Sequence, residues 1–473
     1  MDEATARAQS MLSESMAVGQ VLSERWSKIP GKSIRGYSKH KSVDFLEGID
    51  DPTKRATLAI LFENTLNWLQ GLEETTRMVA VGSYEKFIFP IIRAVYANLV
   101  ASDLVTVQPL TTSTGLVFYF DVLYGSQKGN IPQGGRMFNA LTGPTANYHY
   151  SDEVIEEEAF ATGSGIAAYA ATLAYTPIRA GTFRLTDGTQ TVGDDGNGAL
   201  TGNGAGTVNY ATGLVNVAFT AVVANGTAIT ATYEYNMEAN TNIPEVDLVL
   251  TSSPVTARSQ KLRARWSIES QQDLQSYHGI NAEVELVAFM ANEIAKELNY
   301  KIVRHLAQIA AAGTVTWSRT PPAGVPWIWH KESFYDTLVA GSNAIFSATQ
   351  RRQGNWIVAD VTTCNVIEIL DKFKPQRAAN ENIAGIRKIG TIGEFAVYKD
   401  PTLAAAAAAN GTFLMGYKGN TFLDTGYIWA PYLGLYTTPT VTLDDFISRK
   451  GMAQRTGLKV VNSLFYLTGT VTP

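Results

Sequence analysis

The chain has 473 residues, of which 45% are hydrophobic and 17% charged, a composition that allows about two to four structural units and excludes a disordered protein. Its formal net charge of −5 gives no overall positive field, so any contact with nucleic acid must be local. The single cysteine, Cys364, excludes an intrachain disulfide, and no apolar run is long enough to span a membrane, so we expect a soluble protein made without a secretion signal.

Two amphipathic helices are predicted near the N-terminus, at residues 3–29 and 52–80. Asp51 suits the N-cap of the second helix, and Pro52 suits its first turn. A polar, extended stretch at residues 32–48 joins the two helices. We interpret this region as an arm whose apolar faces dock outside its own core.

A β-rich section follows. Its first long strand, residues 115–125, is predicted to run out into a glycine-rich loop, and its return strand is predicted at residues 260–268. Apolar and basic side chains alternate along the return strand, so one face should pack while the other meets charge. The apolar residues are Leu262, Ala264, Trp266 and Ile268, and the basic ones are Lys261, Arg263 and Arg265, with Arg258 just before them.

Between these strands the composition changes. Residues 182–236 contain almost no lysine, arginine or glutamate and are rich in glycine, threonine, asparagine and alanine. Short alternating segments are separated by turn signals at Asp187-Gly188, Thr212-Gly213 and Asn225-Gly226. We predict an inserted antiparallel β-domain, a sandwich or partial barrel, whose ends lie close together because the host strands still have to pair.

The most strongly patterned stretch is residues 281–309, where apolar residues recur every three or four positions from Val284 onward. Asn281 suits the N-cap, acidic residues occupy the first turn, and Gly313 follows the end of the pattern. We predict a helix of roughly 45 Å, which is longer than an ordinary globular domain needs and favours an extended, flat subunit.

Several further elements are predicted in the remainder of the chain, which is typical of an α+β protein with a mixed sheet formed late in the chain. They are helices at 327–346 and 361–373, a buried strand at 354–360, and strands at 386–398, 412–416, 427–436 and 457–467.

No group of residues has the spacing of a catalytic or metal site. The five histidines lack metal-ligand spacing, and no Gly-x-Ser-x-Gly elbow supplies a nucleophile. The acidic run Glu156, Glu157 and Glu158 is typical of a solvated face, and the alternative is that it meets basic residues of a neighbour. We therefore expect no enzyme, no cofactor and no metal.

Several motifs resemble, in this order, the major capsid proteins of tailed phages related to the T-even group. They are Gln108-Pro109, Trp266-Ser267-Ile268-Glu269, Gln272-Asp273-Leu274, His278-Gly279, Gly416-Tyr417-Lys418-Gly419 and Ala430-Pro431-Tyr432. The resemblance implies the Hong Kong 97-type capsid fold, in which an N-terminal arm, an extended E-loop, a peripheral domain built on a long spine helix and an axial domain form a flat tile.

The resemblance implies a division of the chain into consecutive regions. These are an N-terminal arm and helices (1–100), a peripheral-domain strand and E-loop (101–160), the inserted β-domain (161–245), the E-loop return strand and spine helix (246–312), the axial domain (313–440) and a C-terminal return strand to the peripheral domain (441–473).

The expected function is that of a structural protein of the virion capsid, assembled in the host cytoplasm into an icosahedral or prolate head. Its partners would be copies of itself, in hexamers with pentamers or a separate vertex protein, together with portal, scaffold and decoration proteins. Packaged double-stranded DNA would lie on the inner face without sequence-specific contacts, and no membrane is involved. The alternatives are a cellular nanocompartment shell of the same fold and a carbohydrate-active enzyme whose inserted domain binds glycans.

Three expectations concern assembly. The inserted domain should lie on the outer surface or bridge subunits, because it has almost no positive charge to face DNA. The two N-terminal helices should pack mainly on other subunits. The basic face of the return strand (Arg258, Lys261, Arg263 and Arg265, with Trp266 beside it) should contact acidic residues of an adjacent subunit, either Glu156 to Glu158 or those of the spine helix. The alternative is that the basic residues pair with carboxylates of their own chain.

Overall fold

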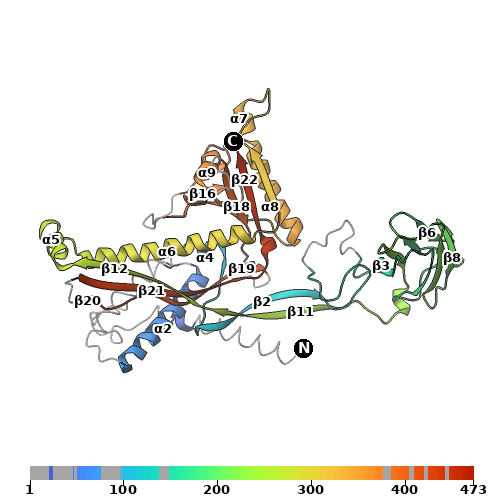
Figure 1. Ribbon diagram of the computed structural model, residues 1–473, viewed down its shortest axis with the longest axis horizontal. Helices are drawn as coiled ribbons and strands as arrows, with labels where there is room; N and C mark the ends of the chain where they lie inside the picture. Colours follow the sequence, from blue (N-terminus) through green and yellow to red (C-terminus); the bar gives the residue numbers. More distant parts are fainter. Residues whose placement is uncertain are drawn as a thin grey trace. The chain divides into compact units, whose positions relative to one another are not determined.

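The computed structural model describes residues 21–24, 46, 49, 51–75, 96, 99–137, 149–376, 385–403, 410–419, 424–442 and 447–473. The chain forms two compact units, one made of Met1–Tyr119 with Leu250–Pro473 and the other of Phe120–Val249. Strands β2 (Thr114–Tyr124) and β11 (Val246–Thr256) pair with each other, and the chain passes between the units within them (Figure 1). The first unit mixes helices and strands, and the second is built almost entirely of strands.

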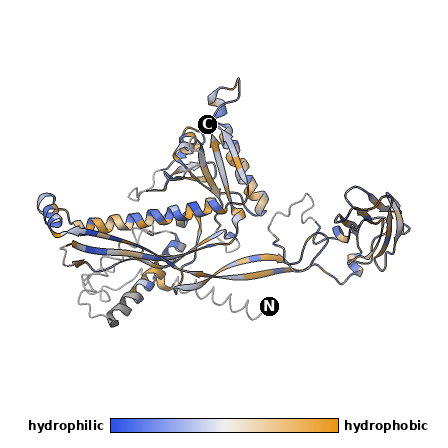
Figure 2. Ribbon diagram, in the orientation of Figure 1, coloured by the Kyte–Doolittle hydropathy of each residue, from blue (hydrophilic) through white to orange (hydrophobic). Residues whose placement is uncertain are grey.

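The longest helix among the described residues is α6 (Ala282–Ile309), which lies where the sequence pattern predicts it. Asn281 caps it by accepting hydrogen bonds from two backbone N–H groups of the first turn. Hydrophilic and hydrophobic residues alternate along α6 (Figure 2), and its apolar face is buried in the main core of this unit. Inside that core the side-chain oxygen Oδ1 of Asn299 accepts a hydrogen bond of 3.1 Å from the backbone N–H of Ala101, the first residue of α4 (Ala101–Leu104). This buried polar side chain is therefore satisfied.

One sheet of the first unit has the strand order β1-β19-β21-β12, with β20 paired to β21. The strands are β1 (Thr106–Val107), β12 (Arg258–Ser267), β19 (Tyr427–Thr437), β20 (Val441–Thr442) and β21 (Ile447–Val460). Strand β1 runs parallel to β19, and the other pairs are antiparallel. Within the described part of the chain, β12 is thus an edge strand that pairs with β21 on one side.

The predicted second N-terminal helix is α2 (Pro52–Thr75), and the Asp51 carboxylate accepts a hydrogen bond of 3.4 Å from the backbone N–H of Lys54. Its buried apolar side chains, which join the same core as α6, include Leu58, Ala59, Leu61 and Phe62. The prediction that this helix docks mainly on other subunits is therefore wrong for its described side chains, because they are buried within the chain, where α2 packs on β19. The helix predicted at 3–29 lies outside the described residues except for 21–24, which are helical.

A second sheet in this unit has the strand order β13-β22-β18-β14-β17-β16-β15. The strands are β13 (Thr314–Ser318), β14 (Trp356–Ala359), β15 (Phe373–Pro375), β16 (Arg387–Ile392), β17 (Phe395–Lys399), β18 (Gly411–Gly416) and β22 (Tyr466–Thr472). Two pairs are parallel and the others antiparallel, so the predicted mixed sheet is confirmed. All four residues of β14 are buried, as its continuous apolar run predicts.

Helices cover this second sheet. They are α7 (Trp327–His330), α8 (Ser333–Thr349) and α9 (Val361–Ile367), and α8 and α9 contact its strands. The single helix predicted at 327–346 is two helices. The chain turns between them at Lys331, whose ammonium group is held by the carbonyl of Ile369 at 3.2 Å and the carboxylate of Asp371 at 3.1 Å.

Two strands belong to a different sheet from the one that the predicted division of the chain implies. Strand β19, expected in the region 313–440, pairs with β21 in the five-stranded sheet, whereas β22, expected to return to the peripheral domain, pairs with β18 and β13. The strand predicted at 457–467 is likewise wrong, because β21 ends at Val460 and a 3-10 turn, η3 (Ser463–Phe465), precedes β22. The pairings of β22 with β18 and β13 join residues far apart in sequence, and a local pattern does not encode which strand becomes the partner of another.

Between β12 and α6 lies α5 (Ile268–His278), a helix where the return strand was predicted to end. Ser267 caps its start by accepting a hydrogen bond from the backbone N–H of Ser270, and Gly279 ends it with φ 65°. Only glycine adopts this left-handed conformation without strain, so the His278-Gly279 motif marks a helix end.

The second unit contains one eight-stranded sheet of order β3-β10-β5-β6-β7-β8-β9-β4, in which every neighbouring pair is antiparallel. The strands are β3 (Val154–Thr162), β4 (Ala168–Thr172), β5 (Arg184–Thr186), β6 (Thr191–Asp194), β7 (Ala199–Gly202), β8 (Gly204–Val208), β9 (Leu214–Phe219) and β10 (Ala228–Glu234), followed by the 3-10 turn η1 (Met237–Ala239). The two edge strands, β3 and β4, contact each other, so the sheet curls into a partial barrel around its own core.

The inserted domain is larger than the sequence indicates. It was expected to begin at residue 161, but the sheet already begins with β3 at Val154, and the unit extends over Phe120–Val249.

The return strand does not pair with the strand that the sequence predicts as its partner. Strand β2 pairs with β11, whereas β12 pairs with β21. Residue Pro254 lies inside β11, and a two-stranded ribbon tolerates a proline because each strand has an open edge.

Candidate interaction surfaces

The side chains of Lys261, Arg263 and Arg265 are exposed on one face of β12, and Arg258 at the start of the strand is exposed as well; we call these four residues the basic row. The apolar residues between them are less exposed toward the end of the strand. Leu262 is 37% exposed, Ala264 packs against the main core, and Trp266 is 7% exposed. The predicted alternation of a charged and a packed face is therefore confirmed, with Leu262 the weakest member of the packed face.

The basic row has no carboxylate of its own chain to pair with in the part of the chain that the structure describes. In the ladder between β12 and β21, Lys261 lies opposite Ala453, Arg263 opposite Gly451 and Arg265 opposite Arg449. Like charges directly opposite each other on a sheet are unfavourable. The row is thus a patch of positive charge on an edge strand, where a second chain can approach.

Trp266 belongs to the chain's own packing. Its indole Nε1 donates a hydrogen bond of 2.8 Å to Gln271 Oε1, which ties the end of β12 to helix α5. Since 7% of its surface is exposed, little of the ring remains for a partner. Of the predicted contact residues on this strand, the four basic ones are accessible and Trp266 is not.

The predicted acidic run lies on β3 of the second unit, where each residue has a different environment. The Glu158 carboxylate accepts hydrogen bonds from the Tyr233 hydroxyl and from the backbone N–H of Ala174, so it is used within the unit. Glu156 lies 3.5 Å from a ring nitrogen of His149. Glu157 is exposed, with φ 50° in a β-bulge, and its carboxylate accepts a bond of 3.4 Å from Asn130.

An ion pair that the sequence did not reveal joins α6 to β21. The Lys450 ammonium and the Thr440 hydroxyl both donate to Glu283 Oε1. Partial burial tends to raise the pKa of Glu283, but these two hydrogen bonds outweigh it, and the net shift is downward. Glu283 is therefore committed within the chain, whereas Glu285 and Glu297 of the same helix are exposed.

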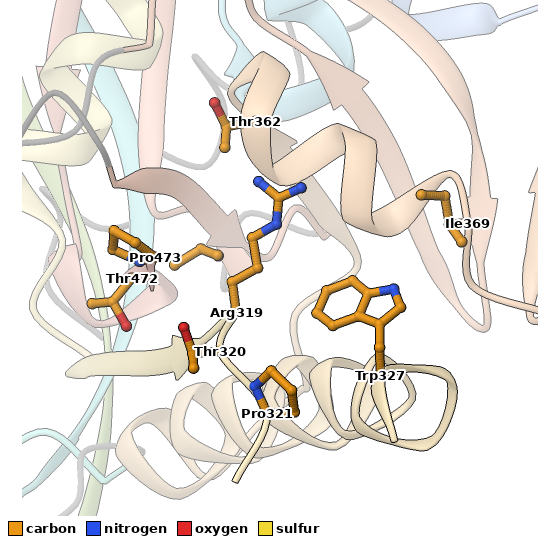
Figure 3. Close-up of a pocket in the computed structure, with 9 residues that line it drawn as sticks. Arg319, Thr320, Pro321, Trp327, Thr362, Ile369, Thr472 and Pro473 are labelled. Atoms are coloured by element: carbon orange, nitrogen blue, oxygen red, sulfur yellow. The ribbon is translucent and has the colours of Figure 1, made fainter. Parts of the chain in front are cut away.

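A second surface, also missed from the sequence, surrounds α7. Val325, Trp327, Ile328 and Trp329 are all exposed there, and we call them the tip residues. Beside α7 lies a cavity of about 520 Å³, lined by Arg319, Thr320, Pro321, Trp327, Thr362, Ile369, Val471, Thr472 and Pro473. Figure 3 shows the Arg319 side chain extending toward α9, which carries Thr362, with the Trp327 indole to one side. In the sequence, the tryptophans of this segment look like core residues.

Among the described residues, no three His, Cys, Asp or Glu side chains are grouped so that they could hold a metal ion. No helix in this part of the chain is both long and apolar enough to cross a membrane. Cys364 is fully buried, and burial raises the pKa of its thiol to about 12. The thiol is thus a packing group of α9.

Comparison with known proteins identifies the class of this chain. A relative described as a major capsid protein from Vibrio phage KVP40 is 28% identical over 427 residues, covering 80% of this chain and 77% of the relative. The major capsid protein of Enterobacteria phage T4 is 28% identical over 378 residues, covering 74% of this chain and 70% of the relative. The class is therefore the major capsid proteins of tailed phages.

The family follows from a match over most of the chain. The family model described as "Major capsid protein Gp23" matches residues 81–472, and the chain belongs to this family. Among solved structures, the capsid of an empty GTA particle covers 79% of this chain and 90% of its own at 10% identity, with a TM-score of 0.33. A score of this size adds nothing to the assignment, which depends on the sequence matches.

Proposed function

We propose that this major capsid protein forms the wall of an icosahedral or prolate head around double-stranded DNA, with the Hong Kong 97-type fold. Its ring-shaped capsomers would be hexamers, with pentamers or a separate vertex protein at the vertices. Family membership supports this proposal, and so does the long helix α6 packed on a sheet whose edge strand carries exposed charge. The role is structural, and no cofactor takes part in it.

In this proposal α6 is the spine helix, and the five-stranded sheet with α6 is the peripheral domain. The pair β2 and β11 is the stem of the E-loop, and the unit Phe120–Val249 is the domain inserted in it. The seven-stranded sheet is the axial domain, to which β22 contributes its C-terminal strand. The inserted domain would lie outside or bridge subunits, because a surface poor in basic residues is unsuited to DNA.

The observation that carries the proposal is the basic row without carboxylate partners among the described residues. Placed against an adjacent subunit, it would meet exposed carboxylates such as Glu157 of the inserted domain or Glu285 and Glu297 of the spine helix. Each exposed pair would contribute only about 0–1 kcal/mol. Because the pair is repeated at every symmetry-related contact, its contributions to the free energy of assembly add up, and it fixes the register between subunits.

Electron microscopy of the full-length chain, expressed alone and then with its phage's scaffold protein, tests the proposal. We expect closed shells or open tubes built of ring-shaped capsomers, with portal and decoration proteins joining only in infected cells. Single chains under both conditions would overturn the proposal. Shells loaded with an enzyme instead of DNA in their native source would favour a nanocompartment.

A further inference from the structure

The cavity beside α7 contains a cation, the guanidinium of Arg319. Within the described residues the Arg319 guanidinium forms no ion pair or side-chain hydrogen bond, although the backbone N–H of Arg319 donates to the carbonyl of Thr472 at 2.8 Å. Around it lie the Trp327 ring and the side chain of Ile369, which is 57% exposed (Figure 3). At about 520 Å³, the cavity falls within the range of roughly 300–1,000 Å³ that is usual for pockets that enclose a ligand. Its lining suits a flat apolar group with a π face.

The opposite side of the same helical turn carries a projection. Trp329 is 71% exposed and Ile328 62% exposed, which is unusual for such large apolar side chains. In a helix, residues two positions apart are rotated by about 200° about the helix axis, so their side chains point to nearly opposite sides. Trp327 therefore faces the cavity while Trp329 faces away from it.

The turn is held rigidly. The His330 ring stacks on Trp317 at 5.0 Å between ring centroids, and its Nε2 donates a hydrogen bond of 2.8 Å to the Ser318 carbonyl. Trp317 Nε1 donates to the Ser333 hydroxyl at 2.9 Å, and that hydroxyl donates to the His330 carbonyl at 2.7 Å. A turn tied down in this way loses little backbone freedom when a partner covers it.

We propose that Trp329 of one copy inserts into the Arg319 cavity of the next copy around the capsomer ring. The indole would lie on the Arg319 guanidinium and pack against Trp327 and Ile369. A projection and a cavity on opposite sides of one element form a head-to-tail contact, and such contacts close into rings when the rotation between copies allows it. A partner of another kind would occupy only one of the two surfaces, whereas a second copy uses both. This inference rests on the proposed assembly into capsomers.

Cysteine cross-linking in assembled particles tests the contact directly, because Cys364 is the chain's one cysteine and is buried. The double variant Trp329→Cys with Ile369→Cys, assembled at a protein concentration high enough to offset the lost indole and treated with a short bis-maleimide, should give a ladder of covalent multimers on a denaturing gel. Either single variant should stay monomeric. The matched control Trp329→Cys with Tyr277→Cys, whose second site is 80% exposed on α5, should also give no ladder. A dimer band from Trp329→Cys alone would overturn the inference, because it would show that two tips meet symmetrically.

Assembly of single variants gives an independent readout. Trp329→Ala should raise the protein concentration needed for assembly about tenfold or more, as expected when a hot-spot tryptophan is lost. Trp329→Phe should recover part of that loss. Normal assembly of Trp329→Ala, together with no ladder from the cysteine pair, would overturn the inference and leave the capsid function intact. If the unmodified chain forms no capsomers under any condition, the proposed function itself fails.

Discussion

Arg265 lies directly opposite Arg449 in the antiparallel ladder between β12 and β21. Like charges on facing residues of a sheet are unfavourable, so this juxtaposition by itself does not stabilise the chain, and among the described residues Arg265 has no carboxylate partner. The arrangement becomes favourable when a carboxylate from outside approaches the basic row. Charge reversal on this strand should therefore separate the stability of the subunit from its assembly.

We expect the double variant Arg263→Glu with Arg265→Glu to fold and to assemble poorly. Opposite charges at positions 265 and 449 should leave the free energy of unfolding unchanged or raise it by about 0.2–1 kcal/mol. The assembly threshold should rise about tenfold or more, because each contact loses an attraction and gains a repulsion. Chemical denaturation of the unassembled chain and light scattering during assembly measure the two quantities.

The matched control reverses two exposed charges elsewhere in the same unit, Lys374→Glu on β15 with Arg387→Glu on β16. It changes the net charge equally, so a general charge effect would slow its assembly too. If the β12 double variant assembled as well as this control, the basic row would be merely solvated. Raised salt should weaken assembly of the unmodified chain more than that of the β12 variant.

The sequence predicts those elements whose signals are local. Helix α6 begins after the Asn281 cap as expected, and the turns at Gly188, Gly213 and Gly226 have positive φ, as their Asp-Gly, Thr-Gly and Asn-Gly pairs predict. The buried strand β14 could also be predicted, because four consecutive apolar residues fit a strand covered on both faces.

Strand partners could not be predicted in the same way. Residues on both sides of Ala257 are extended, and the sequence does not reveal that the first stretch pairs with β2 and the second with β21. The candidate contact surface was predicted in part. The basic row followed from alternation, but the tip residues resemble a core pattern, and exposure depends on which elements happen to cover them.

Helix α6 offers a test of how far its apolar stripe extends into the core. Ile302 is fully buried in the core that also contains Trp429, whereas Val284, on the same predicted stripe, is 45% exposed. We expect Ile302→Ala to lower the free energy of unfolding by about 2–5 kcal/mol, because it leaves a cavity among packed side chains. Val284→Ala should change it by less than about 0.5 kcal/mol. Urea unfolding followed by tryptophan fluorescence measures the free energy of unfolding of both variants. Equal losses of stability in the two would contradict the difference in burial between Ile302 and Val284.

The inserted domain should depend on Asp187 in a way that varies with pH. This carboxylate is 7% exposed and accepts hydrogen bonds from the backbone N–H groups of Thr189 and Gln190 and from both of their side chains. Burial tends to raise the pKa of Asp187, but these bonds outweigh it and lower the pKa from 3.8 to about 2. Since the folded-state pKa is the lower one, this stabilisation is complete above about pH 4 and is lost as the pH falls toward about 2.

Asp187→Asn should therefore destabilise the inserted domain at neutral pH by about 1–2 kcal/mol and remove that part of its pH dependence. Tryptophan fluorescence does not report on this domain, because all eight tryptophans lie outside Phe120–Val249. Hydrogen exchange measured on peptides from this unit, from about pH 2 to neutral, is the suitable readout because it includes the range in which Asp187 is protonated. Glu238→Gln, which changes an exposed carboxylate of η1, serves as the control and should have little effect. Equal exchange in the two variants would contradict the role of Asp187.

The last prediction concerns Cys364, whose thiol is fully buried and lies 3.6 Å from the Ala359 carbonyl. Because the thiolate is the reactive form and burial raises the pKa of this thiol to about 12, a maleimide at pH 8 should not label the native chain. Unfolding in urea should expose one reactive thiol per chain, so the labelling rate also measures opening of the second sheet. Trp329→Cys provides the positive control, since that side chain is 71% exposed and should react at once. Labelling of the unmodified native chain as fast as that control would show that α9 and β14 do not enclose the thiol.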